Sequence, residues 1–190
     1  MPGPGMTYYK SVISSKLTEA CYTRAGCHPG RKSRDLLKEY LYIKTMTEIL
    51  LRYLHFLAIL TIAATVLAEY LLLKPVMTRR EIGRLAKIDA VYGLAAVVLL
   101  GAGLTLWLGG VGKPSFFYTK NWIFHLKVGL FALVGILSIY PTVYFLKHRK
   151  GDPDEKVTLP SRIVRLLQLE LLLLLIIPLL ATLMSRGIGL

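Results

Sequence analysis

Four long apolar segments alternate with short polar ones along the chain. They cover residues 54–73, 91–108, 128–146 and 166–184. A helix needs about 20 apolar residues to cross the ~30 Å hydrocarbon core of a bilayer. The pattern therefore predicts an all-α protein, a four-helix transmembrane bundle with spans at about residues 49–73, 88–108, 121–146 and 164–185.

The composition excludes a soluble domain. Hydrophobic residues make up 54% of the 190 residues, and the mean hydropathy is +0.53. A soluble protein of this length would have to bury four helices that are apolar on all sides, and it has too little polar chain to cover them. We therefore expect an integral membrane protein in contact with the lipid bilayer, with its four-span domain over residues 46–190.

The positive charge indicates orientation. Lysine and arginine total 24 against 11 aspartate and glutamate residues, a net charge of +13. These basic residues form no single patch, so nucleic acid is not an expected partner. Eleven of them lie between spans one and two and between spans three and four: Lys74, Arg79, Arg80, Arg84, Lys87, Lys147, Arg149, Lys150, Lys156, Arg162 and Arg165. The positive-inside rule places these two loops in the cytoplasm of a bacterium and both termini of the four-span domain outside its inner membrane.

Residues 1–45 disturb that assignment. They carry eight further lysine and arginine residues on the supposed outer side, and no apolar stretch that could serve as the core of a signal peptide. Met46, followed by Thr47 and Glu48, is a better candidate for the first residue of the protein. We expect residues 1–45 to be an N-terminal extension outside the working protein, either disordered or the product of a misassigned start codon. The alternative is a short cytoplasmic or interfacial helix near residues 35–45, with the topology reversed.

A projection at 100° per residue predicts the inward faces of the first three spans. On span one, His55 shares a face with Ala58, Ile62, Val66 and Glu69. Spans two and three each show a face rich in small residues, which membrane helices use for close packing. These faces carry Asp89, Tyr92, Gly93, Ala96, Leu100 and Gly103 on span two, and Asn121, His125, Gly129, Ala132 and Ile136 on span three.

The alternating direction of the spans sorts the polar residues into two tiers. The outer tier contains Arg52, His55, Asn121 and His125. The inner tier contains Glu69, Asp89, Tyr92 and Glu170. Ionisable groups inside a membrane are costly and usually mark a functional site, so both tiers are candidate sites.

Two interpretations of the outer tier stay open. Neutral imidazoles on facing helices are common axial ligands, so His55 and His125 could ligate a metal or a b-type haem. Arg52 or Lys127 would then hold carboxylates of the haem or of a tetrapyrrole substrate, beside Asn121. The alternative is a pair of histidines hydrogen-bonded to Asn121, Tyr53 or the backbone.

Lys127 and the inner tier each have a simple structural interpretation. Lys127 stands about 200° around the helix from His125, so we expect it to extend outward to the interface, with a carboxylate partner as the alternative. The inner carboxyl groups are expected to pair with Lys74, Arg84 or Arg165. The alternative is a proton path or a substrate gate.

Several short segments resemble a known family. They are residues 52–58 (RYLHFLA) with Glu69 downstream, residues 89–93 (DAVYG), Phe117-Tyr118 with Asn121, residues 124–127 (FHLK) and residues 140–142 (YPT). Together they resemble an uncharacterised family of bacterial four-helix predicted membrane proteins of unknown function, over residues 46 to about 186. Residues 122–127 (WIFHLK) more distantly resemble the copper-resistance-D-type proteins and the four-helix membrane protoporphyrinogen oxidase.

Three functions follow as expectations. The first is a redox protein that binds b-type haem or a metal through His55 and His125. The second is a small permease or copper-handling protein, a homodimer or larger complex in which the inner tier relays protons or ions. The third is a non-catalytic helper subunit of a membrane complex. No phosphate loop, nucleophile elbow or zinc-protease motif indicates soluble-enzyme chemistry, and whether the chain is an enzyme stays open.

Overall fold

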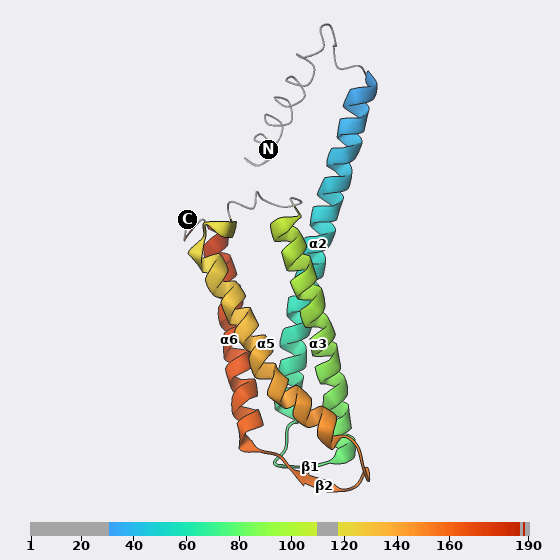
Figure 1. Cartoon of the computed structure of the whole chain (residues 1–190), viewed down its shortest axis with the longest axis vertical. Coiled ribbons are helices and arrows are strands. Elements are labelled where there is room, and N and C mark those ends of the chain that lie inside the picture. The colour runs from blue at the N-terminus through green and yellow to red at the C-terminus, as the bar shows by residue number, and fades with distance from the viewer. Residues whose placement is uncertain (1–30, 110–117, 187, 189–190) are drawn as a thin grey trace.

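The protein is a bundle of four long helices. The computed structural model describes residues 31–109, 118–186 and 188. The helices are α2 (Arg31–Leu72), α3 (Arg79–Leu108), α5 (Trp122–His148) and α6 (Ser161–Ser185). Each is long and apolar enough to cross a membrane, which confirms the predicted fold class (Figure 1).

Helix α2 is longer than the first predicted span. It continues without a break from Arg31 through Met46 to Leu72. Residues 31–45 are therefore helical, as in the alternative of a helix near residues 35–45, and the start of the chain at Met46 stays a prediction. The segment contains neither proline nor glycine, so nothing in its sequence stops the helix from extending in the N-terminal direction.

The bundle consists of two helical hairpins joined at one end. Helix α2 packs along α3, and α5 packs along α6. At the end where α2 and α5 finish, β1 (Val76–Thr78) pairs antiparallel with β2 (Lys156–Thr158), with Met77 opposite Val157 (Figure 1). This two-stranded sheet, which the sequence analysis did not predict, links the two hairpins through their connecting loops.

Arg79 and a helix cap hold the sheet to the bundle. Thr78 caps α3 in a capping box with Glu81. The Arg79 guanidinium donates to both carboxylate oxygens of Glu155, at 2.6 and 2.8 Å, and to the carbonyl oxygen of Lys150 at 2.6 Å. A bidentate arginine–carboxylate pair fixes geometry as well as charge, so this contact sets the position of the second loop on the first.

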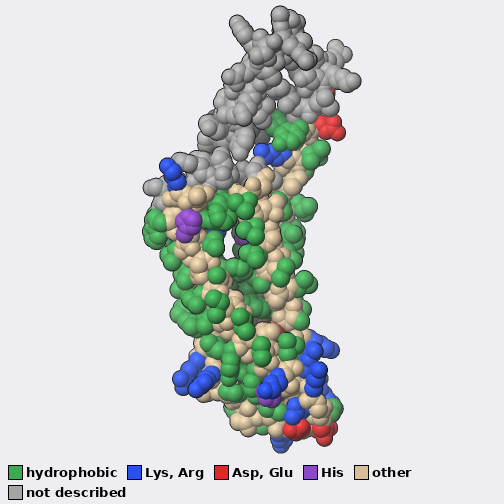
Figure 2. Space-filling model, viewed as in Figure 1, with side chains coloured by type: hydrophobic (Ala, Val, Ile, Leu, Met, Phe, Trp, Pro, Cys, Tyr) green, Lys and Arg blue, Asp and Glu red, His purple; other side chains and the backbone are tan. Residues whose placement is uncertain are grey.

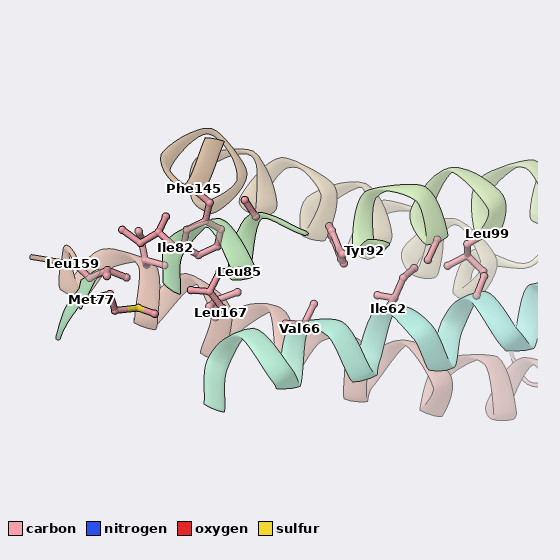
Figure 3. Close-up of a cluster of buried hydrophobic side chains, with 14 residues drawn as sticks. Ile62, Val66, Met77, Ile82, Leu85, Tyr92, Leu99, Phe145, Leu159 and Leu167 are labelled. Atoms are coloured by element: carbon pink, nitrogen blue, oxygen red, sulfur yellow. The ribbon is translucent and has the colours of Figure 1, made fainter. Parts of the chain in front are cut away.

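The core has an apolar layer on either side of its middle. Near the sheet, the buried side chains are Met77, Ile82, Leu85, Phe145, Leu159, Ile163 and Leu167. Farther along the bundle lie Ala58, Ile62, Val66, Ala95 and Leu99. Figure 3 shows labelled members of both groups, with Tyr92 beside Val66 and Ile62 of the second group.

The outer surface is suited to lipid. Large apolar side chains are exposed along all four helices, among them Leu60, Leu94, Ile136 and Leu175. Lysine and arginine side chains gather at the sheet end, below this apolar surface (Figure 2). The protein is thus an integral membrane protein that contacts lipid with its apolar belt.

The structure corrects two predicted faces. On α3 the buried row is Asp89, Tyr92, Ala95, Leu99 and Ala102, whereas Gly93 and Leu100 face outward. The small residues therefore do not all mark the packing face.

On α5 the predicted face is almost reversed. Gly129, Ala132 and Ile136 are exposed, and Val134, Ser138 and Phe145 are buried. Asn121, which the projection placed on the same face as His125, is the N-cap of α5 and has extended backbone angles. Its direction therefore does not report the phase of the helix that follows.

Candidate functional site: a polar layer inside the bundle

A polar layer interrupts the inward rows of three helices. On α2 the row Ala58, Ile62, Val66 ends at Glu69, which is 2% exposed. On α3 Asp89, 5% exposed, follows Leu85, and on α6 Glu170, 1% exposed, follows Leu167. The spacing of three or four residues keeps each carboxyl group on the buried face of its helix. Three carboxyl groups from three helices therefore meet inside the bundle, and the predicted face of α2 is confirmed.

These carboxyl groups lie close enough to act on one another electrostatically. Glu69 experiences the charges of Asp89 and Glu170, and Glu170 experiences that of Asp89. The Tyr92 hydroxyl is one turn from Asp89 and lies beside Ser138 of α5. The charges of all three carboxyl groups act on it. Four of the residues predicted as the inner tier thus form one cluster.

Helix α5 supplies hydroxyl groups to the layer. The Thr142 hydroxyl donates to Asp89 Oδ1 at 2.8 Å, and the Ser138 hydroxyl donates to the carbonyl oxygen of Gly135 at 2.8 Å. Between them lies Pro141, which is fully buried and has no N–H to give to the carbonyl group of Leu137. The sequence analysis missed both hydroxyl groups, although the YPT segment that contains Thr142 was among the resemblance motifs.

The carboxyl groups have no basic partner among the described residues. Ion pairs join none of the three to lysine or arginine there. Lys74 pairs with Glu81 at 2.9 Å, because the capping box brings that carboxylate to the end of α3. The expected pairing of the inner tier with Lys74, Arg84 or Arg165 is therefore wrong. Within the described chain, Glu69 Oε1 and Glu170 Oε1 are buried without a hydrogen-bond partner.

His55 lies in the other half of the bundle. Its ring packs against Gly103 of α3, where an added Cβ would be 3.4 Å from His55 Cε1. The Leu99 backbone and the charge of Lys127 both act on the ring electrostatically. Its Nδ1 is buried and has no partner among the described residues. His55 is thus an inward-facing histidine with one unused ring nitrogen.

His125 does not face His55. It is exposed, and its Nε2 lies 2.9 Å from the carbonyl oxygen of Thr119. The expectation that it points into the bundle is wrong, because the buried face of α5 contains Ile123 and Phe124 instead. Within the described residues, no three His, Cys, Asp or Glu side chains form a group that could hold a metal ion. Ligation of a metal or haem by His55 and His125 stays a prediction.

The remaining residues of the outer tier have structural contacts. Arg52 is exposed and pairs with Glu48 at 2.6 Å. Asn121 Oδ1 accepts from the backbone N–H of Ile123 at 2.9 Å and of Phe124 at 3.3 Å, and Asn121 Nδ2 donates to the Ile188 carbonyl oxygen at 3.1 Å. These contacts fix the start of α5 to the C-terminal end of the chain.

Lys127 lies on the inner side of α5. It is only partly exposed, its Nζ lies 5.6 Å from the centre of the Phe124 ring, and its charge acts on His55. Phe124 is buried and stands one turn nearer the start of α5 than Lys127 does. The expected extension of Lys127 to the interface stays a prediction.

Fold and site together define a four-span integral membrane protein with a carboxyl-rich polar layer. Residues 47–189 match the model of the family described as "Predicted membrane protein (DUF2214)", and the chain belongs to this family. The resemblance to an uncharacterised membrane protein family is thus confirmed. No curated protein and no solved structure matches the chain.

Proposed function

We propose that the protein binds and transfers protons within the membrane at the polar layer of Glu69, Asp89 and Glu170. One observation supports this most directly: two of these carboxyl groups have a buried oxygen atom without a partner among the described residues. An isolated carboxylate in an apolar medium costs many kcal/mol, and three together repel one another. The layer can stay neutral by taking up protons from solution.

Hydroxyl groups support proton transfer within this layer. The hydroxyl groups of Tyr92 and Thr142 can each donate and accept a hydrogen bond. Thr142 already donates to Asp89, so a proton on that carboxyl group can be exchanged without breaking the contact between α3 and α5. A proton suits the site better than a metal ion, because the described carboxyl groups are not arranged as a metal-binding group.

The location and assembly belong to the same proposal. The protein acts in a bacterial inner membrane, with the sheet end in the cytoplasm, as the basic residues at that end favour. Two copies form the working unit, because four spans are few for a complete transport path. The apolar layers on either side of the carboxyl groups then act as barriers. A proton crosses them only when the bundle rearranges.

Proton flux into vesicles tests the proposal. The purified chain is reconstituted into liposomes that contain a pH-sensitive dye, and a potassium gradient with valinomycin drives proton entry. We expect flux well above that of protein-free liposomes, reduced about tenfold or more in Glu69→Gln and Glu170→Gln. Asp154→Asn is the matched control, because this carboxylate is 82% exposed and lies outside the helices.

Two results would reject proton transfer. One is flux equal to that of protein-free liposomes. The other is flux that stays the same in both glutamine variants. Glutamine preserves the size and polarity of glutamate, so size-exclusion profiles that match the wild type would show that any loss of flux does not arise from misfolding.

A haem-binding redox role is the second candidate, and His55 supports it. A buried ring nitrogen without a described partner, on a ring packed against Gly103, is suited to axial ligation. The weak likeness of residues 122–127 to copper-resistance-D-type proteins and protoporphyrinogen oxidase points the same way. Since His125 is turned outward, a second ligand would have to come from elsewhere.

Visible absorption spectra test this candidate. The protein is expressed with haem supply, purified in mild detergent and measured in oxidised and reduced form. A stoichiometric b-type spectrum that disappears in His55→Ala would support it. A colourless protein, or a spectrum that persists in that variant, would reject His55 as the ligand.

A further inference from the structure

A cationic and an imidazole side chain meet in the half of the bundle opposite the sheet. Lys127 of α5 acts electrostatically on His55 of α2, and the His55 ring lies against Gly103 of α3. Three helices thus contribute to one place. It lies apart from the polar layer, because Ala58, Ile62 and Leu99 of the apolar core stand between the two.

The lysine has no acidic partner in the described chain. Ion pairs among the described residues do not include Lys127, and its ammonium group lies 5.6 Å from the centre of the Phe124 ring. A largely covered ammonium group without a counter-charge is costly inside a membrane. An anion that bound here would supply that charge.

The imidazole adds a second requirement. His55 Nδ1 is buried without a partner among the described residues, and a neutral imidazole has one acceptor nitrogen. A ligand that satisfies both groups carries a negative charge for Lys127 and a hydroxyl group for His55. Gly103 provides the space for the ring, because its missing side chain would lie 3.7 Å from His55 Nδ1.

The depth matches that of lipid head groups. Helix α3 has 30 residues and is therefore about 45 Å long, close to the ~40–45 Å of a bilayer with its head groups. Gly103 stands five residues before the end of α3, and Lys127 five residues after the start of α5. Each lies about 8 Å below its helix end, at the boundary between hydrocarbon and head groups.

The surface is open at this level. Figure 2 shows a hollow between α3 and α5 in the half of the molecule away from the basic end. The hollow lies on the lipid-facing side, so a lipid can enter sideways without crossing the bundle. A soluble ligand would have to come from the aqueous end.

We propose that His55 and Lys127, beside Gly103, form a binding site for an anionic phosphate group that carries a hydroxylated head group, as in an acidic phospholipid such as phosphatidylglycerol. Lys127 binds the phosphate, and His55 accepts a hydrogen bond from the head-group hydroxyl. The same chemistry occurs in free glycerol phosphate, so the experiment must separate the two sources. The site is independent of proton transfer at the polar layer.

Native mass spectrometry of the full chain tests the site. The protein is released from nanodiscs that contain equal amounts of phosphatidylglycerol and phosphatidylethanolamine, and retained lipids are counted. We expect one phosphatidylglycerol per chain, retained about tenfold less in Lys127→Gln and several-fold less in His55→Phe. Lys127→Arg keeps the charge and is expected to retain it. Lys147→Gln removes an exposed lysine from the same helix near the sheet, and His125→Gln removes the outward histidine; both should bind as the wild type does.

Each outcome of this experiment supports or overturns the proposed site. Equal retention in Lys127→Gln and Lys147→Gln would overturn the site, and so would phosphatidylethanolamine retained as strongly as phosphatidylglycerol. Displacement of the lipid by millimolar sn-glycerol 3-phosphate would support a phosphate-binding site and would identify soluble glycerol phosphate as a ligand. Purified protein with haem bound at His55 would overturn the proposal. None of these results depends on the liposome flux, so the two proposals fail separately.

Discussion

Glu69 and Glu155 are the same residue type in opposite surroundings. Glu69 is buried between helices without a basic partner among the described residues, whereas Glu155 is half exposed and paired with Arg79. A hydrophobic carbodiimide reacts with neutral carboxyl groups that are reachable from lipid. We predict that peptide mass spectrometry will find the adduct on Glu69 or Glu170 and not on Glu155. Labelling of Glu155 alone would contradict the view that the polar layer holds protons.

Among the described residues, Thr142 of α5 is the one side chain that donates a hydrogen bond to Asp89 of α3. Replacing it with valine keeps the shape but leaves a buried carboxyl oxygen without its donor, which costs about 1–3 kcal/mol. We predict that Thr142→Val lowers the free energy of unfolding by this amount in a detergent titration. Thr142→Ser keeps the hydroxyl group and should lose less than half as much. Equal losses in both variants would assign the effect to packing.

At the scale of elements, the ion pair between Arg79 and Glu155 beside the sheet stabilises the fold in a pH-dependent way. The hydrogen bond from Arg79 holds the pKa of Glu155 below its ordinary value. A carboxyl group with a lowered pKa in the folded state stabilises the fold above its ordinary pKa, and this contribution is lost as the pH falls. We predict that the wild-type melting temperature drops more than that of Glu155→Gln between about pH 5 and pH 3. Asp154→Asn should follow the wild type, and parallel curves for wild type and Glu155→Gln would contradict the assignment.

The loop before β2 needs a glycine. Gly151 has a φ of +120°, and an added Cβ would lie 3.0 Å from Arg79 Nε. Both the backbone angle and the contact disfavour a side chain, so we predict that Gly151→Ala lowers the free energy of unfolding by about 1–2 kcal/mol. Gly83→Ala is the control, because no atom lies within 4 Å of its added Cβ. There, alanine should leave stability unchanged or raise it by up to about 1 kcal/mol.

The elements differ in how well their sequence determines them. Apolar length alone predicted the four helices, because any span must be long and apolar. The buried face of α2 followed from periodicity, since Ile62 and Val66 lie in regular register with Glu69. The pairing of β1 with β2 joins residues about 80 positions apart, and no local pattern encodes such a contact.

The sites show the same difference. Glu69, Asp89 and Glu170 could be predicted as a group because carboxyl residues are rare in apolar segments. The outward turn of His125 could not, because the small residues aligned with it, Gly129 and Ala132, are exposed and do not mark the packing face. The meeting of Lys127 with His55 depends on how α5 packs against α2 and α3, which is a property of the assembled bundle.

For the whole molecule, the sheet ties both basic loops to one end of the bundle (Figure 2). In the proposed orientation these loops stay in the cytoplasm, and the ends of α3 and α6 lie outside. We predict that, in cells producing a variant with Cys21 and Cys27 replaced by serine, a membrane-impermeant maleimide labels Arg186→Cys from outside. It should label Asp152→Cys only after the membrane is permeabilised. The reverse result would place the sheet outside and would mean that the basic residues before Met46 override those of the loops.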